Sequence, residues 1–426
     1  MLDIKLIREN PKLVKENITR RKDPEILKRL DELIKKDERF RIALKELEDL
    51  RHKRNVVTAE VAEAKKKGKD STEKIKQMRI VGEEIADLEE EHARLQEEIR
   101  PLLLRIPNLL HESVPPGKDD TENVEIKRWG KQNFSFSPKN HLEIIENLGL
   151  VDMDRAAKVA GHGFYYLKND LLLLDRALQQ FALDFLMKKK FTIMQPPFMM
   201  SRKAYEGVTS LADFDDVLYK IEGQDLHLIA TSEHPMAAMH MDETILAEKL
   251  PIKLAGISPC FRKEVGTHGK YTKGLFRVHH FNKIEQFVFC LPEDSWKIHE
   301  EMQKLSEEIY QALGIPYRVV NVCTGDLGII AAKKYDTEFL MADGQYREIG
   351  SNSNCTDYQA RRLNVKYREK EGTAPKGFVH TLNNTALSGN RPMIAIIENH
   401  QQPDGSIKIP KVLWPYMGGV KELVKK

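Results

Sequence analysis

Two runs of apolar residues, spaced alternately by three and four positions, occupy residues 26–105 of this 426-residue chain. The first run extends from Leu30 to Val61 and the second from Met78 to Leu102. Such a repeat places one apolar stripe along each helix, and two helices of this kind can pack as a coiled coil. We therefore predict a long antiparallel helical hairpin.

The predicted hairpin turns at KKKGKDS, residues 65–71. Gly68 and Asp70 can break a helix at this point, and Ser71 can cap the helix that follows. The apolar repeat is imperfect near the turn because it places basic residues on the seam. Looser packing is therefore expected toward the tip of the hairpin.

Charge is distributed unevenly along the hairpin. Residues 51–79 carry ten basic and four acidic side chains, whereas residues 80–98 carry eight acidic side chains and one basic one. A basic tip suits contact with a phosphate backbone. A solvated face that keeps a long helix soluble explains the same charges equally well, and charge alone leaves both interpretations open. The residues predicted to contact nucleic acid are Arg51, Arg54, Lys65, Lys66, Lys67 and Lys69.

The composition and the spacing of apolar residues change after the hairpin. Residues 111–123 contain two prolines and a glycine in succession, which indicates a linker between a first domain at 1–110 and a second at 124–426. The second domain has short alternating runs and two helical stretches without a regular βαβ rhythm, so we predict an α+β domain with an antiparallel sheet and flanking helices. The runs read as strands lie within 225–233, 274–290, 317–322 and 345–354, and the helical stretches are 172–190 and 294–313.

Composition excludes several classes of protein. The formal net charge is +3 and no window holds 18 uncharged apolar residues, so no membrane-spanning segment is expected. The amino terminus lacks the apolar region of a signal peptide. The cysteines form no C-x-x-C pair, which favours reduced thiols in a cytoplasmic protein over a zinc knuckle or a disulfide framework. They are Cys260, Cys290, Cys323 and Cys355.

The stretch FRKEVGTHGKYTKGLFRVHHFNKIE, residues 261–285, is read as strand, loop and strand. Alternate residues of a strand point to opposite faces. Arg262 and Glu264 would then share one face of the first strand, with a basic glycine-rich loop at 265–274. If 275–289 is one strand, a single face carries Arg277, His279, Phe281, Lys283 and Glu285.

Other polar residues follow the same pattern. Thr231 and Glu233 would share a strand face, Glu348 precedes a small polar cluster that includes Ser351, and Arg391 would stand at the start of a helix. Taken singly, each of these polar residues would usually just face the solvent. Together they suit a nucleotide, with arginines for phosphates, an aromatic ring for a base and carboxylates for a metal or an amine. Neither a P-loop nor a Rossmann glycine motif occurs.

At this point the chain resembles the class II aminoacyl-tRNA synthetases. FALDFLMKKKFTIMQPPFMM at 181–200 resembles their motif 1, in which Pro196 or Pro197 would lie at a dimer interface, residues 261–285 resemble motif 2, and LNNTALSGNRPMIAIIENHQ at 382–401 resembles motif 3. These three motifs occur in the order found in the class.

Within that class the resemblance is to the seryl-tRNA synthetases and covers essentially the whole chain. TSE at 231–233, REIGSNSNCTDYQARR at 347–362, WPYMGG at 414–419 and the amino-terminal hairpin match these enzymes. NNTALSGNR, where bacterial members have roughly NGSGLAVGR, is similar to the archaeal and eukaryotic variants. The hairpin distinguishes the chain from the zinc-dependent enzyme of some methanogens, so no zinc is expected.

The resemblance implies a serine–tRNA ligase that uses ATP and Mg²⁺, acts on L-serine and serine tRNA (and selenocysteine tRNA where present), and forms a homodimer through motif 1. In the family the hairpin grips the long variable arm of the tRNA. The implied catalytic residues are Arg262, Glu264 and Arg391. The implied ATP site comprises Arg262, Lys263, Glu264, Val278, Phe281, Glu348, Ile349, Gly350, Ser351 and Arg391, with Mg²⁺ at Glu348 and Ser351. The implied serine site comprises Thr231, Ser232, Glu233, Arg262, Glu285, Asn383 and Thr385.

Two other functions compete with this interpretation. A homologue could activate an amino acid for a carrier protein, but such homologues generally lack the hairpin. A non-catalytic RNA-binding paralogue would be expected to lose some of the charged site residues. This chain keeps all of them.

Overall fold

The computed structural model describes residues 1–210, 216–264 and 274–425. The chain falls into two compact units, Met1–Leu109 and Leu110–Lys426. The smaller unit consists of the helices α1 (Ile4–Glu9), α2 (Pro11–Thr19), α3 (Pro24–Lys66) and α4 (Thr72–Arg105). No helix in the described part of the chain is long and apolar enough to cross a bilayer.

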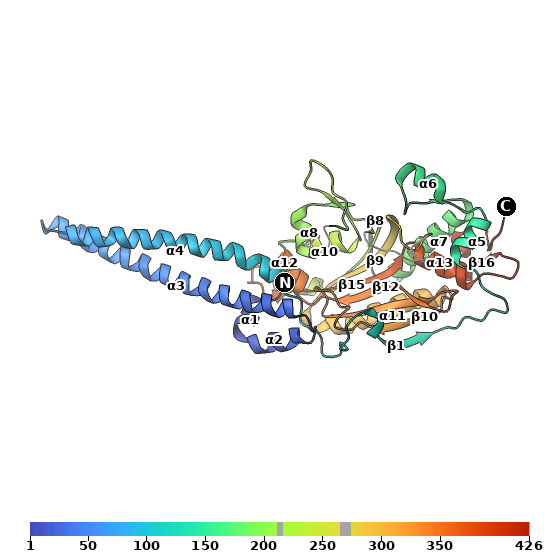
Figure 1. Ribbon diagram of the computed structural model, residues 1–426, viewed down its shortest axis with the longest axis horizontal. Coiled ribbons are helices and arrows are strands. Elements are labelled where there is room, and N and C mark those ends of the chain that lie inside the picture. Colours follow the sequence, from blue (N-terminus) through green and yellow to red (C-terminus); the bar gives the residue numbers. More distant parts are fainter. Residues whose placement is uncertain (211–215, 265–273, 426) are drawn as a thin grey trace. The chain divides into compact units, whose positions relative to one another are not determined.

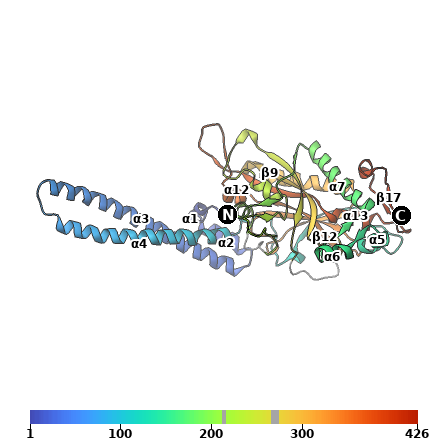
Figure 2. The ribbon, with the colours of Figure 1, turned by 90° about the horizontal axis from the view of Figure 1, so that it is seen from above.

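The predicted hairpin is confirmed, since α3 and α4 run side by side in opposite directions (Figures 1 and 2). Leu47 of α3 packs with Val81 and Ile85 of α4. The seam differs from the predicted one, because Ala43 is buried whereas Leu44 is exposed. A straight α-helix drifts relative to a 3.5-residue repeat, which brings such neighbouring positions onto the seam.

The turn of the hairpin is capped by a different residue from the one predicted. The helix α3 ends at Lys66, and Gly68 has a positive φ of 65°. Oδ1 of Asp70 accepts hydrogen bonds from the backbone N and the Oγ1 of Thr72, at 2.9 Å and 2.6 Å. Within the described hairpin the Ser71 side chain makes no capping hydrogen bond. Asp70 therefore caps the first turn of α4.

The larger unit is built on an eight-stranded sheet, which confirms the predicted α+β class with its antiparallel sheet (Figure 1). Every pairing in the sheet is antiparallel except that of β4 with β8. In spatial order the strands are β1 (Val124–Trp129), β10 (Tyr317–Asn321), β11 (Lys333–Leu340), β12 (Tyr346–Asn354), β15 (His380–Ser388), β9 (His280–Cys290), β8 (Ile252–Phe261) and β4 (Thr192–Met194).

Helices and short strand pairs surround this sheet. The helices are α5 (His141–Asn147), α6 (Met153–Ala160), α7 (Asn169–Lys188), α8 (Arg202–Val208), α10 (Glu233–Ala238), α11 (Ser295–Ala312), α12 (Tyr358–Leu363) and α13 (Asn390–Asn399). The short strands are β2 (Val151–Asp152), β3 (Tyr166–Leu167), β5 (Met199–Met200), β6 (His227–Leu228), β7 (Thr244–Leu246), β13 (Lys366–Arg368), β14 (Gly377–Phe378), β16 (Ile407–Lys408) and β17 (Glu422–Leu423).

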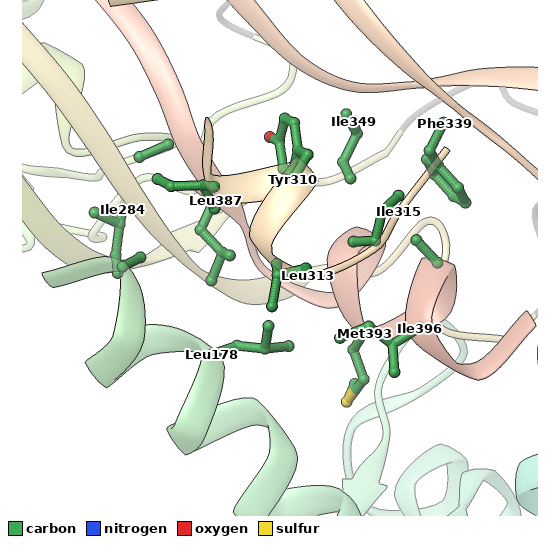
Figure 3. Close-up of a cluster of buried hydrophobic side chains, with 14 of the residues drawn as sticks. Leu178, Ile284, Tyr310, Leu313, Ile315, Phe339, Ile349, Leu387, Met393 and Ile396 are labelled. Carbon is green, nitrogen blue, oxygen red and sulfur yellow. The ribbon is translucent and has the colours of Figure 1, made fainter. Parts of the chain in front are cut away.

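One face of the sheet carries the main hydrophobic core (Figure 3). Ile284 of β9 and Leu387 of β15 pack there with Leu178 of α7, Tyr310 of α11 and Met393 of α13. Since side chains alternate along a strand, the neighbours of Ile284 point the other way. This alternation directs Glu285 to the opposite face, where the polar residues of the motifs gather.

Two of the predicted strands are shorter than expected. β9 begins at His280 rather than at 275, so Arg277 and His279 do not belong to the strand and the predicted five-residue face is wrong at these positions. β8 ends at Phe261, which pairs with His280, so Arg262 and Glu264 lie beyond the strand and do not share a strand face as predicted. One backbone hydrogen bond, from N of Arg262 to O of His279, follows the last pair. The extended backbone ends where this pairing ends.

The strand predicted at 225–233 is only His227–Leu228. Glu233 is the first residue of α10, so Thr231 and Glu233 do not share a strand face. The helices predicted at 172–190 and 294–313 are confirmed by α7 and α11, and the runs at 317–322 and 345–354 are confirmed by β10 and β12. The predicted loop at 265–274 lies, except for Gly274, outside the described residues.

Candidate active site

A cavity of about 230 Å³ opens on the polar side of the sheet, over β9, β12 and β15 and beside the residues that follow β8. Most of the predicted nucleotide-binding residues meet in it, although they come from four separate parts of the sequence. The predicted residues that line it are Arg262, Glu264, Val278, Phe281, Glu348, Ile349, Gly350, Thr385 and Arg391.

Two arginines of the cavity lie over aromatic rings. The guanidinium of Arg262 is 5.2 Å from the centroid of Phe281, and that of Arg391 is 4.9 Å from the centroid of Phe276. Arg391 also donates to the backbone O of Glu348 at 2.7 Å and lies 3.3 Å from the carboxylate of that residue. Cation–π contacts of this kind orient a guanidinium while leaving donors for an anion. Phe276 was not among the predicted site residues.

Two glycines allow the strands to approach each other at the cavity. A Cβ on Gly350 would lie 2.8 Å from the Cβ of Thr385 on the neighbouring strand β15. Gly389 has a positive φ of 47°, and a Cβ there would lie 2.9 Å from the Cβ of Phe281. Glycine is thus required by close contact at both positions.

A buried group of charges adjoins the cavity. Nζ of Lys283 lies 2.5 Å from Oε2 of Glu285 and donates to Oγ1 of Thr231 at 3.2 Å. Nε of Arg262 donates to the backbone O of Ala230, which precedes Thr231. The sequence correctly predicted that Lys283 lies on the strand β9, but it gave no binding or catalytic role to the residue. Its partner Thr231 is 52 positions away, so no local pattern reveals the contact.

Glu233 completes this group of charges. Its Oε1 accepts from Nδ2 of Asn383 at 3.2 Å and from Nε2 of Gln359 at 3.3 Å. Burial, together with the nearby Glu285, raises the pKa of Glu233 to about 7. Burial also raises the pKa of Glu285, although Lys283 acts in the opposite direction. Two carboxylates and two cations therefore share a site from which water is largely excluded.

Glu348 of β12 lines the cavity, and Asp336 stands on the neighbouring strand β11. Burial raises the pKa of Asp336 to about 6, and the residue pairs with Ser351 across the two strands. Partial desolvation would raise the pKa of Glu348, whose side chain is 49% exposed, but Arg391 and Lys334 outweigh it and lower that pKa. No cluster of three or more histidine, cysteine, aspartate or glutamate side chains suited to a metal occurs among the described residues.

The structure places some predicted residues away from the cavity. The Lys263 ammonium lies over the ring of Tyr219, 5.9 Å from its centroid. Ser232 is fully buried and its Oγ donates to the backbone O of Gly256 at 3.0 Å, which supports the turn before α10. Glu233 and Asn383 line a second cavity, of about 350 Å³.

The six predicted nucleic-acid contacts belong to the hairpin. All of them are exposed. Arg51 forms a surface ion pair with Glu89 at 2.6 Å, and Lys67 pairs with Glu63. Exposed pairs of this kind are weak and exchange readily for another anion.

Comparison with known proteins agrees with this geometry. The family model of the tRNA synthetase class II core domain (G, H, P, S and T) matches residues 218–400, and that of the seryl-tRNA synthetase N-terminal domain matches residues 1–110. The serine–tRNA ligase of Methanocella arvoryzae is 53% identical over 99% of this chain and 100% of its own length.

Solved structures give the same result. The seryl-tRNA synthetase of Pyrococcus horikoshii complexed with ATP is 49% identical, with a TM-score of 0.96 and full coverage of both chains. The cytoplasmic serine–tRNA ligase of Naegleria fowleri in complex with AMP is 38% identical, with a TM-score of 0.88 over 100% of this chain and 99% of that one. The chain described here therefore belongs to the seryl-tRNA synthetases, the serine–tRNA ligases of class II.

Proposed function

We propose that the cavity joins L-serine to the α-phosphate of ATP and then passes the seryl group to the 3′ end of serine tRNA. The observation that carries the proposal is that Arg262 and Arg391 line the cavity, and that two carboxylates within the electrostatic reach of Arg262, the buried Glu285 and the partly buried Glu233, adjoin it. Carboxylates suit the ammonium of an amino acid, and arginines suit its carboxylate and the phosphates.

In the first step an oxygen of the serine carboxylate attacks the α-phosphorus, and the bond to pyrophosphate breaks. Both reactants are anionic, so positioning and charge neutralisation dominate catalysis. Arg262 bridges the serine carboxylate and the α-phosphate, while Arg391 binds the γ-phosphate. In the second step the 3′-hydroxyl of the terminal adenosine attacks the seryl carbonyl, and AMP leaves.

The adenine is bound by Glu264, by the backbone near Val278 and by the ring of Phe281. The segment 349–351 and Lys263 belong to the same proposed ATP site, although Lys263 reaches the phosphates only by leaving Tyr219. The relatives from Pyrococcus and Naegleria, solved with ATP and AMP, support an adenine nucleotide as the ligand.

Magnesium accompanies the ATP in this proposal. The Glu348 carboxylate and the Ser351 hydroxyl are hard oxygen donors, and Mg²⁺ is commonly held by one or two carboxylates together with substrate phosphates. Oδ1 of the buried Asp336, across the strand pair from Ser351, accepts no hydrogen bond from the described residues. These residues fit a magnesium ion, which supplies positive charge at the phosphates when bound.

Serine is recognised by polar groups that its hydroxyl and ammonium satisfy. We assign these contacts to Thr231, Glu233, Glu285, Asn383 and Thr385, with Ser232 supporting the turn. A site that hydrogen-bonds a substrate hydroxyl rejects analogues without it, because its buried polar groups are then left unpaired. Alanine should therefore be rejected strongly.

The remaining proposals concern the larger assembly. Residues 1–110 would form the tRNA-binding domain, with the arm at about 26–105 contacting the long variable arm of serine tRNA, and of selenocysteine tRNA where present. Residues 111–123 would be the linker and 124–426 the catalytic domain. Motif 1 would form a homodimer, and the protein would act in the cytoplasm.

The experiment that tests this function is ATP–pyrophosphate exchange with each of the twenty amino acids, without tRNA. Exchange with serine, followed by charging of serine tRNA, supports the proposal. Exchange with another amino acid instead would indicate a carrier ligase. Folded protein that gives no exchange with any amino acid would indicate a non-catalytic paralogue.

A further inference from the structure

Lys283 is a buried cation to which the proposed reaction gives no role. It stands on β9, two residues before Glu285, so both side chains point to the polar face of the sheet. Its side chain is 10% exposed and lines the cavity together with Arg262 and Arg391. Its two partners, Glu285 and Thr231, are residues assigned above to the serine ammonium.

The ion pair of Lys283 with Glu285 is close but poorly aligned. Nζ lies 2.5 Å from Oε2 of Glu285. Lys283 and Thr385 both act on the Glu285 carboxylate, but no donor among the described residues is aligned with Oε2 itself. Glu285 is 1% exposed, and a carboxylate oxygen so deeply buried normally has an aligned donor. The oxygen is therefore available to a second donor.

Binding of an amino acid creates a conflict at this point. The ammonium of serine, placed at Glu285, would lie next to the ammonium of Lys283, and like charges repel strongly where water is excluded. Serine also brings a carboxylate, so it adds one charge of each sign. The conflict disappears if Lys283 leaves Glu285 and pairs with the carboxylate that arrives.

We propose that Lys283 holds the place of the substrate ammonium in the empty site. When serine binds, Lys283 exchanges Glu285 for the serine carboxylate and lies beside Arg262. The four-carbon stem of lysine allows this movement, which a rigid guanidinium fork would restrict. The inference rests on the proposed function, and it makes Lys283 a substrate-binding residue that distinguishes amino acids from simple amines.

The test compares serine with serinol, 2-amino-1,3-propanediol, which keeps the ammonium and a hydroxyl but lacks the carboxylate. Serine is measured by ATP–pyrophosphate exchange and serinol as a competitive inhibitor of it. For Lys283→Met we expect kcat/KM for serine to fall on the order of 10- to 100-fold, the loss of a hydrogen bond to a charged group. The Ki of serinol should stay the same or decrease, because serinol gives Lys283 no new partner.

Two further variants separate this role from a structural one. Lys283→Arg keeps the charge and should recover part of the lost activity for serine. Lys333→Met is the matched control, because Lys333 stands on β11 of the same sheet and its side chain is also 10% exposed. Its Nζ lies 3.6 Å from Oε1 of Glu300 on α11. This variant should leave both serine and serinol unchanged.

Several outcomes would overturn the inference. If Lys283→Met weakens the binding of serine and of serinol equally, Lys283 only maintains the shape of the pocket. If the variant keeps the wild-type kcat/KM for serine, Lys283 is dispensable. If Lys283→Met fails to fold, the test is a crystal structure of the wild type with serine and a non-hydrolysable ATP analogue, in which the serine carboxylate is still free. Lys283 should then have left Glu285, and an unchanged ion pair contradicts the proposal. Absence of serine-dependent exchange in the wild type would instead refute the proposed function itself.

Discussion

At the scale of single residues, Glu233 is the side chain whose protonation most affects the site. Burial and the neighbouring Glu285 raise its pKa to about 7, so it changes charge near neutral pH. A carboxylate binds an ammonium well only when it is ionised. Folding stability changes with pH in the opposite direction. Because the pKa of Glu233 is raised in the folded chain, its contribution to the free energy of unfolding is fully present below the ordinary pKa of 4.5 and is lost as pH rises through 7.

Serine binding should therefore strengthen as pH rises from 6 to 8. With a pKa near 7, the ionised fraction of Glu233 grows about tenfold over this interval, and KM for serine should fall by a similar factor. KM is measured by ATP–pyrophosphate exchange across this range for the wild type and Glu233→Gln. The variant should bind serine weakly with a much flatter profile, and a flat wild-type profile would contradict the role of Glu233.

Gly350 offers a second prediction at this scale. A Cβ at this position would lie 2.8 Å from the Cβ of Thr385, so Gly350→Ala must displace a strand at the cavity. Overpacking of this kind costs about 1–3 kcal/mol. We expect lower thermal stability and a higher KM for both substrates. Gly328→Ala is the control, since no described atom comes within 4 Å of a Cβ built there, and it should behave like the wild type.

At the scale of elements, Asp37 holds the short helix α1 to the long helix α3. It is 3% exposed, accepts from Nε and Nη2 of Arg8 at 2.8 Å and 2.7 Å, and also accepts from Arg41 at 3.2 Å. A planar, two-point contact of this kind is among the stronger hydrogen-bonded pairs in proteins. Asp37 lay on the predicted apolar seam, where an isolated charge would be unfavourable.

Removal of this contact should loosen α1. Asp37→Ala leaves Arg8 without its partner and should lower the local stability of α1 and α3 by about 1–3 kcal/mol. Hydrogen–deuterium exchange of the intact chain measures the effect at these helices. Asp31→Ala removes an exposed pair with Lys15 and should cost about 1 kcal/mol or less. Equal effects of the two variants would mean that the burial of Asp37 is unimportant.

The elements also show what could be predicted from the sequence. The hairpin follows from a repeat of three and four residues, and β10 and β12 follow from alternation, because both patterns are local. The start of β9 is set by the end of β8, and the partner of Lys283 lies 52 positions away. Such features depend on pairing between distant segments and have no local pattern. The motifs predicted most of the residues that line the cavity, but they gave no role to Phe276 or Lys283, which also line it.

At the scale of the whole molecule, the helix α7, whose second half belongs to motif 1, exposes apolar side chains. Leu172, Leu173 and Met187 of α7 are all more than 40% exposed, while Leu171 and Leu174 are buried in the core. Exposed apolar residues gathered on one element are typical of an interaction surface. This surface agrees with the proposed homodimer.

Introducing charge on this surface should separate the dimer. The double variant Leu172→Glu and Leu173→Glu keeps the buried residues of α7 and should sediment as a monomer, because burying two carboxylates without partners is unfavourable. Analytical ultracentrifugation measures the mass. Ile42→Glu on the hairpin, 51% exposed, is the control and should remain dimeric. A monomeric wild type would refute the dimer, and a dimeric double variant would move the interface elsewhere.

The hairpin is not uniform along its length. Leu30, Leu33 and Leu47 of α3 are buried, whereas beyond Leu47 no residue of α3 is fully buried. Local unfolding occurs first where few apolar contacts hold a segment. The arm is thus well packed near its base and loosely packed toward its tip, and its outer turns can bend at little cost. The outer turns can therefore change shape without disturbing the packing of the helices at the base.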